Sequence, residues 1–272
     1  MKFPIYLDYN ATAPMDKRVL DEMMPYFTDV FGNAASRNHA YGWQAEQVVS
    51  KAREQIASIL GANEKEIIFT SGATESDNLA ILGVAEFHKE KGNHIITAPT
   101  EHKAVIDPCR YLEQKGYEVT YLDVDKEGCI DLQQLEDSIT DKTILVSLMA
   151  ANNEIGTLHP LKEIGAITRK KGVIFHCDAT QGVGKIPIDV NEMNIDLLSM
   201  TAHKIYGPKG VGVLYVRRKR PRIRLSPIFH GGGHERGLRS GTLNVSGIVG
   251  FGKAVEIAQA EMSAESERLI AL

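Results

Sequence analysis

The stretch VIFHCDATQGVGKIPIDVNEMNIDLLSMTAHKIYGPKG, residues 173–210, decides the fold. A short apolar run over 173–177 predicts a buried strand that ends on Asp178, and a second run over 195–200 predicts another strand. This second strand is followed at once by a polar cluster that contains Lys204. In an open α/β sheet, the carboxyl ends of the strands face a ligand crevice. We therefore expect both polar clusters to lie in one crevice.

A carboxylate after one strand and a lysine after the next indicate a cofactor that needs both groups. Pyridoxal phosphate is such a cofactor, because a lysine amine holds its aldehyde and a carboxylate keeps its pyridine nitrogen protonated, so that the ring accepts electrons. The alternative is that Asp178 and Lys204 form an ordinary ion pair at the edge of a sheet. Gln181 and His203, which neighbour these two residues, favour the cofactor.

Strand-like and helix-like segments alternate along the rest of the chain. Apolar residues at helical spacing predict helices, and short apolar runs predict strands. The predicted helices cover 40–60, 75–88, 104–115, 131–138 and 248–272, and the further predicted strands cover 66–70, 94–97, 117–122, 143–149 and 211–216. This alternation predicts an α/β fold with a mostly parallel central sheet and helices on both faces.

A turn of small residues, Ser71–Thr74, precedes the predicted helix over 75–88. Such a turn leaves backbone N–H groups unpaired at a helix N-terminus, which binds a phosphate well, and the hydroxyl of Thr74 can add a donor. The alternative is that Ser71 or Thr74 only caps the helix. Together with the other motifs, the turn favours a phosphate site, although both roles can coexist.

Composition and charge exclude several classes of protein. A net charge of −4 gives no electrostatic basis for binding nucleic acid or an anionic membrane. Three cysteines without a CxxC pair predict neither a disulfide framework nor a zinc site, so we expect no metal. No apolar stretch is long enough to span a bilayer. The first strand-like run begins at Ile5, which leaves no room for a signal peptide, so we expect a cytoplasmic protein.

The one basic run, 217–224, could be a nucleic-acid patch. Pro221 interrupts it and no aromatic residues are interleaved, so we expect a solvated strand end instead.

Taken in order, the motifs resemble those of the cysteine desulfurases, the NifS-like branch of the class V aminotransferases. The matching stretches are Tyr6–Pro14, Thr70–Asn78, Thr100–Lys103, Asn152–Gly156, Asp178–Gln181, Thr201–Gly210 and His230–Thr242. Several long motifs in the same order make this a specific match across all 272 residues. The resemblance implies a fold type I enzyme with pyridoxal 5'-phosphate as cofactor. Such an enzyme converts L-cysteine into L-alanine and passes sulfur, as a persulfide, to an iron–sulfur scaffold or a tRNA-thiolation protein.

The resemblance also assigns roles to residues. It implies that Lys204 holds the cofactor, that Asp178 faces the ring nitrogen and that His102 stacks on the ring; these three are the predicted catalytic residues. Gln181 would bond to the phenolic oxygen, and Asn153 would lie near that oxygen and the substrate carboxylate. The residues implied to hold the phosphate are Thr74, Thr201, His203 and, from the partner subunit, Thr242, and Ala73 is a further predicted cofactor-binding residue. The role of Thr242 implies a homodimer with shared active sites.

Members of the family run well past 272 residues, and the part beyond carries most of a small domain, a loop with the nucleophilic cysteine and an arginine for the substrate carboxylate. Cys109, Cys129 and Cys177 fall on a predicted helix, a turn and a buried strand, so we expect none of them to be that nucleophile. We therefore expect a chain that binds the cofactor but makes no persulfide alone.

The expected domains are an N-terminal arm over 1–15, a cofactor-binding large domain over 16–255, and over 256–272 the start of a helix that leads to the small domain. Three alternatives to a desulfurase remain open. They are a selenocysteine lyase, an aminotransferase of the same class, and a non-catalytic truncated subunit. A dinucleotide dehydrogenase is disfavoured, because no GxGxxG motif opens a helix after the first strand.

Overall fold

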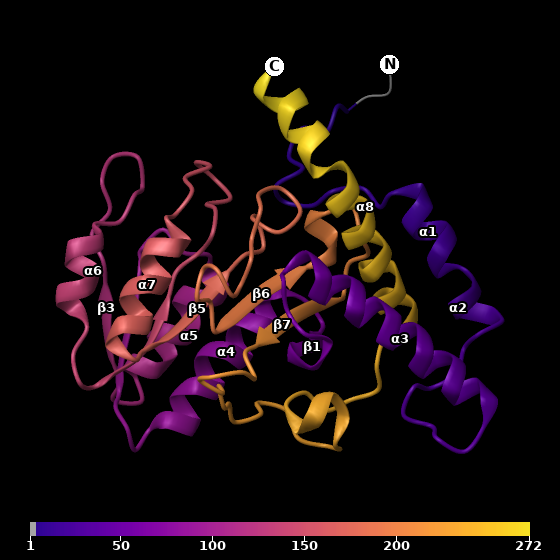
Figure 1. Ribbon diagram of the computed structural model, residues 1–272, viewed down its shortest axis with the longest axis horizontal. Helices are drawn as coiled ribbons and strands as arrows, with labels where there is room; N and C mark the ends of the chain where they lie inside the picture. The colour runs from indigo at the N-terminus through magenta and orange to yellow at the C-terminus, as the bar shows by residue number, and fades with distance from the viewer. Residues whose placement is uncertain (1–3) are drawn as a thin grey trace.

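The computed structural model describes residues 4–272, and one seven-stranded sheet organises this part of the chain (Figure 1). The strands are β1 (Ile67–Thr70), β2 (His94–Thr97), β3 (Glu118–Tyr121), β4 (Thr143–Ser147), β5 (Ile174–Asp178), β6 (Leu197–Thr201) and β7 (Gly212–Val216). Their order across the sheet is β1-β7-β6-β5-β4-β2-β3. The pairs β2–β3, β2–β4, β4–β5 and β5–β6 are parallel, and β7 runs antiparallel to both of its neighbours. The predicted α/β class with a mostly parallel sheet is confirmed.

Helices cover both faces of the sheet. The α-helices are α1 (Lys17–Met23), α2 (Pro25–Thr28), α3 (Ala40–Ile59), α4 (Ala73–His88), α5 (Lys103–Glu113), α6 (Leu132–Ser138), α7 (Leu161–Lys171) and α8 (Val245–Ile270), with short 3₁₀ turns η1 (Glu64–Glu66), η2 (Ala202–Lys204) and η3 (His234–Gly237). One apolar cluster packs α4 and α5 against one face, and a second packs α1, α3, α7 and α8 against the other. In strand β5, Ile174 belongs to the first cluster and Phe175 to the second, because successive side chains alternate between faces.

The predicted elements agree with the structure to within a few residues, with three omissions. Helix α4 begins at Ala73, inside the predicted turn, and α8 begins at Val245. The helices α1 and α2 near the N-terminus and α7 between β4 and β5 were not predicted. The helix α7 carried a readable signal, because three basic residues fill its last turn and Gly172 follows in the left-handed conformation.

The predicted domain boundaries stay predictions. Residues 1–3 of the predicted arm lie outside the described part of the chain. The predicted division between residues 255 and 256 falls inside α8, which is continuous from Val245 to Ile270.

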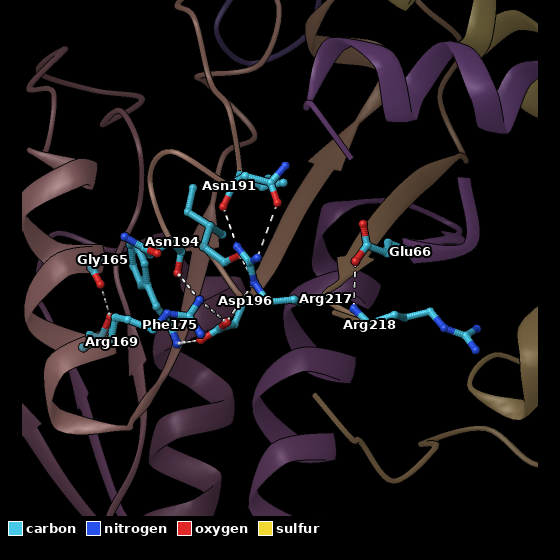
Figure 2. A network of polar contacts seen from close by, with 12 residues as sticks. Glu66, Gly165, Arg169, Phe175, Asn191, Asn194, Asp196, Arg217 and Arg218 are labelled. Atoms are coloured by element: carbon cyan, nitrogen blue, oxygen red, sulfur yellow. Dashed lines mark hydrogen bonds and ion pairs between the residues drawn. The ribbon is translucent and has the colours of Figure 1, made fainter. Parts of the chain in front are cut away.

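The basic run after β7 begins with a buried arginine, so the expectation of a solvated strand end is wrong for Arg217 (Figure 2). Its Nε lies 3.1 Å from Oδ1 of Asp196, and its Nη2 donates to the carbonyl oxygens of Val190 at 2.6 Å and Ile195 at 2.7 Å. A buried charge is tolerated only when it is paired and hydrogen-bonded, and Arg217 meets both conditions. The residues over 218–220 are exposed, as expected.

No helix within residues 4–272 combines the length and the apolar character that crossing a membrane requires.

Candidate active site

A cavity of about 680 Å³ lies at the carboxyl ends of β5 and β6, where the sequence predicts a ligand crevice. Nine of the ten residues predicted to bind the cofactor line it. They are Ala73, Thr74, His102, Asn153, Asp178, Gln181, Thr201, His203 and Lys204. The tenth, Thr242, is exposed and lies outside the set of lining residues that the described chain provides.

Asp178, the last residue of β5, is the buried carboxylate of the cavity. Its Oδ1 accepts a hydrogen bond from the backbone N–H of Thr180 at 2.9 Å. Burial raises the pKa of Asp178 to about 6; the Asp77 carboxylate adds to this rise, and the bonds from Thr180 oppose it. A neighbouring cation would favour the ionised carboxylate again. Asp178 is therefore suited to pair with a cationic ring nitrogen.

A histidine and a second carboxylate lie behind Asp178 in the core. His176 precedes Asp178 by two residues on β5, so both side chains face the same side of the sheet. The Nε2 of His176 lies 3.5 Å from Oδ1 of Asp77 and 3.0 Å from Oγ of Ser199. Burial raises the pKa of Asp77 to about 7 and lowers that of His176 to about 4. The sequence gives Asp77 only as a residue in the first turns of a helix, and nothing in the local pattern indicates that it lies near the site.

Lys204 reaches the cavity from the 3₁₀ turn η2, directly after β6. Its Nζ donates to the backbone carbonyl oxygens of Asn10 and, at 2.9 Å, Ala11. Partial burial lowers the pKa of Lys204, and the carboxylates of Asp8 and Asp178 limit this lowering. A lysine whose pKa is lowered is the kind of amine that reacts with an aldehyde.

The N-terminal arm lies beside the cavity. Asp8, Asn10 and Ala11 line the cavity. The Nε2 of Gln181 donates to the carbonyl oxygen of Asn10 at 2.9 Å, and Nδ1 of His203 lies 3.1 Å from Oγ1 of Thr12. The arm therefore contacts both strand-end clusters.

The turn before α4 forms the other end of the cavity. Gly72 is the N-cap of α4 and no side chain caps the helix, so the alternative that Ser71 or Thr74 serves only as a cap is wrong. Among residues 4–272, the backbone N–H groups of Ala73 and Thr74 have no hydrogen-bond acceptor. These unpaired groups and the positive end of the helix dipole favour an anion here.

The two predicted loop residues, His102 and Asn153, also line the cavity. His102 is the N-cap of α5, and its Nδ1 accepts a hydrogen bond from the backbone N–H of Ala104 at 3.1 Å. The alternative of two asparagines in an ordinary turn holds for Asn152 alone, which is buried and accepts from two backbone N–H groups of its own turn. Asn153 instead lines the cavity, and its Nδ2 donates to Oε1 of Glu154 at 2.8 Å.

The structure adds lining residues that sequence reasoning did not identify. These are Asp8, Asn10, Ala11, Ser71, Gly72, Glu75, Ala151, Glu154, Thr180, Lys209 and Gly210. Many of these residues lie within the quoted motifs. The motifs alone do not show which of their residues line the cavity and which do not.

None of the three cysteines is a lining residue of this cavity within the described chain. Burial raises the pKa of Cys109 to about 12 and that of Cys177 well above its ordinary value. Because the thiolate is the nucleophile, neither thiol is suited to attack sulfur. Cys129 is exposed and is not among the lining residues.

The residues present fit pyridoxal phosphate. The cavity is lined by unpaired N–H groups for an anion, by a buried carboxylate for a ring cation and by Lys204, whose amine can hold an aldehyde. The predicted amide residues Asn153 and Gln181 and the histidines His102 and His203 complete the set. These are the groups that the sequence predicts for binding pyridoxal phosphate, which carries an aldehyde, a ring nitrogen and a phosphate.

The chain is similar in sequence to known proteins over nearly its whole length. The family described as aminotransferase class-V matches residues 5–271. A cysteine desulfurase IscS of Anaeromyxobacter sp. (strain Fw109-5) is 61% identical over 272 residues, which are 100% of this chain and 67% of that protein. A cysteine desulfurase IscS of Pectobacterium carotovorum subsp. carotovorum (strain PC1) is 60% identical over 271 residues, 99% of this chain and 67% of that protein. The chain thus spans about two thirds of the length of these curated relatives.

Solved structures share the fold. A NifS-like protein aligns with a TM-score of 0.92 and 46% sequence identity, covering 96% of this chain and 71% of that one. A second structure, described as SspA in complex with cysteine, aligns with a TM-score of 0.89 and 46% identity, covering 92% of this chain and 72% of that one.

Proposed function

Since this chain belongs to the class V aminotransferases and, among them, to the cysteine desulfurases, we propose that its cavity binds pyridoxal 5'-phosphate and acts on L-cysteine. The observation that carries the proposal is the convergence of Lys204, Asp178 and the free N–H groups of α4 on one cavity. A purely structural ion pair between Asp178 and Lys204 would not require an anion-binding turn beside it. A site for a simple anion would not require a buried carboxylate.

Each of these groups has a role in holding the cofactor. The amine of Lys204 holds the aldehyde, and Asp178 holds a proton at the ring nitrogen. The hydroxyls of Thr74 and Thr201, the N–H groups of the turn, and His203 hold the phosphate. When bound, the cofactor supplies a protonated ring that stabilises negative charge at the substrate Cα.

The remaining side chains orient the ring and the substrate. His102 would stack on the ring, and the Nε2 of Gln181 would donate to the phenolic oxygen. In the present structure that Nε2 group donates to the carbonyl of Asn10, so it is already directed toward the arm side of the cavity. The amide of Asn153 binds without adding charge, which suits a position near a phenolic oxygen and a substrate carboxylate.

The net reaction converts L-cysteine into L-alanine and transfers its sulfur to a cysteine thiolate, which becomes a persulfide. None of the three cysteines lines the cavity in the described chain, and burial raises the pKa of Cys109 and Cys177, so we expect the accepting thiolate to come from elsewhere. The proposed partners are a second copy of the chain, which contributes Thr242 to a shared site, and a sulfur acceptor such as an iron–sulfur scaffold protein.

The test is to load the purified chain with pyridoxal phosphate and add L-cysteine, with L-alanine and L-aspartate as comparison amino acids. We expect the absorption of the bound cofactor to respond most strongly to L-cysteine, and mass spectrometry to find no persulfide on Cys109, Cys129 or Cys177. A stronger response to L-aspartate would favour an aminotransferase. Formation of a persulfide on any of the three cysteines would contradict our account of sulfur transfer.

A further inference from the structure

A carboxylate stands beside the turn that is proposed to hold the phosphate. Glu75 follows Thr74 directly in the first turn of α4, lines the cavity and has a side chain that is only 8% exposed. Its Oε2 accepts a hydrogen bond from the backbone N–H of Ser71 at 2.8 Å. The carboxylate of Glu75 therefore accepts the hydrogen bond of one backbone N–H group of the turn. It also brings a negative charge to the part of the cavity where the phosphate is expected to bind.

An arginine from a distant part of the chain compensates this charge. The Nε of Arg239 donates to Oε1 of Glu75 at 2.8 Å, and its Nη2 lies 3.4 Å from Oε2. Burial alone would raise the pKa of Glu75, but the hydrogen bonds from Arg239 and Ser71 outweigh it and lower the pKa. Glu75 is therefore ionised at neutral pH, and its charge is balanced only while Arg239 stays in place.

The charges around the cavity make this balance important. The carboxylates among the lining residues are Asp8, Glu75, Glu154 and Asp178, whereas the lysines are Lys204 and Lys209. A phosphate that carries two negative charges would enter a cavity whose lining is already negative on balance. Of the four carboxylates, Glu75 is the one on the turn itself, so it is the one whose charge acts most directly on the phosphate.

The segment that carries Arg239 is fixed to its own subunit by side chains. Glu235 is 8% exposed; its Oε1 accepts from Nη2 of Arg53 at 2.7 Å, and its Oε2 accepts from the backbone N–H of Phe69, in the edge strand β1, at 2.7 Å. Glu235 and Arg236 both have positive φ angles, of 45° and 59°, which non-glycine residues adopt only when their surroundings hold them. Arg239 is thus presented to Glu75 by an anchored loop.

We propose that Arg239 is a positioning residue that makes the cavity selective for a phosphorylated cofactor, by neutralising Glu75 and holding its carboxylate on the N–H of Ser71. Arg239 acts through Glu75 and does not itself line the cavity in the described chain. The inference rests on the proposed function, because it assigns the turn to the phosphate of pyridoxal phosphate.

The test compares the affinities of the chain for pyridoxal phosphate and for pyridoxal, which lacks the phosphate, from the visible absorption of the bound aldehyde. Replacing Arg239→Gln leaves Glu75 uncompensated, so we expect pyridoxal phosphate to bind about 10-fold more weakly while pyridoxal stays within about twofold. Arg239→Lys, which keeps the charge, should lose about threefold or less. The double variant Glu75→Gln with Arg239→Gln should regain affinity for pyridoxal phosphate, because it removes the uncompensated charge.

Thermal unfolding of each variant shows whether it folds, and Arg268→Gln, which breaks an exposed pair with Glu265 on α8, is the matched control. Equal weakening of both aldehydes in Arg239→Gln, or no recovery in the double variant, would show that Arg239 only supports the structure and would overturn the inference. If the unaltered chain bound neither aldehyde, the proposed function itself would fail, and the two failures are therefore distinguishable.

Discussion

The floor of the cavity and the loop over 230–242 belong to the same predicted site but are held in place differently. The floor is built from the ends of two central strands, whose residues are buried and paired with neighbouring strands along the sheet. The loop is attached to the edge strand β1 by two side chains: Glu235 accepts from the backbone N–H of Phe69, and Arg236 donates to the carbonyl oxygen of Ile67. Local sequence thus builds the floor, whereas the loop depends on partners far along the chain.

The floor residues converge within one chain, whereas Thr242, at the end of the loop, is exposed and is not among the residues that line the cavity in the described chain. The loop is anchored to its own subunit by Glu235 and Arg236. The family resemblance implies that its end, at Thr242, contacts the site of the neighbouring subunit.

The largest expected effect comes from breaking the anchor of the loop. Replacing Arg53→Met leaves Glu235 buried without its cation, and its side chain is only 4% exposed, so we expect a loss of about 3–5 kcal/mol in the free energy of unfolding. Arg268→Met is the control, because its pair is exposed and should be worth less than about 1 kcal/mol. Urea unfolding measures both. Equal, small losses would mean that the loop is not held by this pair.

The next effect tests the floor through its buried carboxylate. The pKa of Asp178 is raised from 3.8 to about 6, so the ionised group lowers the stability of the cofactor-free chain as the pH rises through this range. Asp178→Asn removes the ionisation and keeps an acceptor for the N–H of Thr180. We expect it to leave stability unchanged near pH 4 and to raise it by up to about 3 kcal/mol near pH 8.

The advantage of the amide at pH 8 should be lost when the cofactor is bound, because a neutral amide cannot balance the positive charge of the protonated ring nitrogen. Asp178→Asn should then bind pyridoxal phosphate more weakly than the unaltered chain does at pH 8. Asp21→Asn, in an exposed helical pair with Lys17, is the control and should show neither behaviour. A variant that is less stable at pH 8 than the unaltered chain would contradict the burial argument.

A third, smaller effect contrasts two glycines, one in each region. A Cβ on Gly212 of β7 would lie 2.5 Å from the Cα of Gly72, so the phosphate turn packs directly on the sheet. We expect Gly212→Ala to cost about 1–3 kcal/mol and to weaken cofactor binding. In the loop, Gly233 has φ −98° and nothing within 4 Å of an added Cβ, so Gly233→Ala should cost about 0.5 kcal/mol or less. Calorimetry on both variants measures the loss of stability. Equal losses would contradict the close packing of Gly212 against Gly72.

The smallest effect tests whether the loop serves a second subunit. Thr242→Ala should leave the stability unchanged and weaken the binding of pyridoxal phosphate by about tenfold, since one hydrogen bond to a charged group is lost. Mixed dimers of Thr242→Ala and Lys204→Ala chains should contain one intact site, which combines the unaltered Lys204 of one subunit with the unaltered Thr242 of the other. If mixing restored no cofactor binding, each site would be complete within its own chain.

The sequence predicts the floor well because the relevant signals are local. Short apolar runs end where Asp178 and Lys204 begin their polar clusters, and the small-residue turn precedes a helix that indeed starts without a side-chain cap. In each case, residues within a few positions of one another determine both the element and its end.

The remaining features could not be predicted because they depend on contacts between distant residues. Arg217 looked like part of a solvated run but is buried against Asp196, and Asp77 looked like a helix-start residue but lies behind the cavity. The pairing of Arg239 with Glu75 joins residues that are 164 positions apart. Composition and spacing carry no information about such pairs.

If Lys204 carries the cofactor, chemical trapping of the bound aldehyde should locate it on this residue. The chain is incubated with pyridoxal phosphate, reduced with borohydride and digested, and mass spectrometry then locates the attached cofactor. We predict that it is found on Lys204, that Lys204→Ala abolishes both the attachment and the visible absorption band, and that Lys209→Ala, which removes the other lysine lining the cavity, retains both. Attachment to a different lysine, or an unchanged absorption band in Lys204→Ala, would contradict the account.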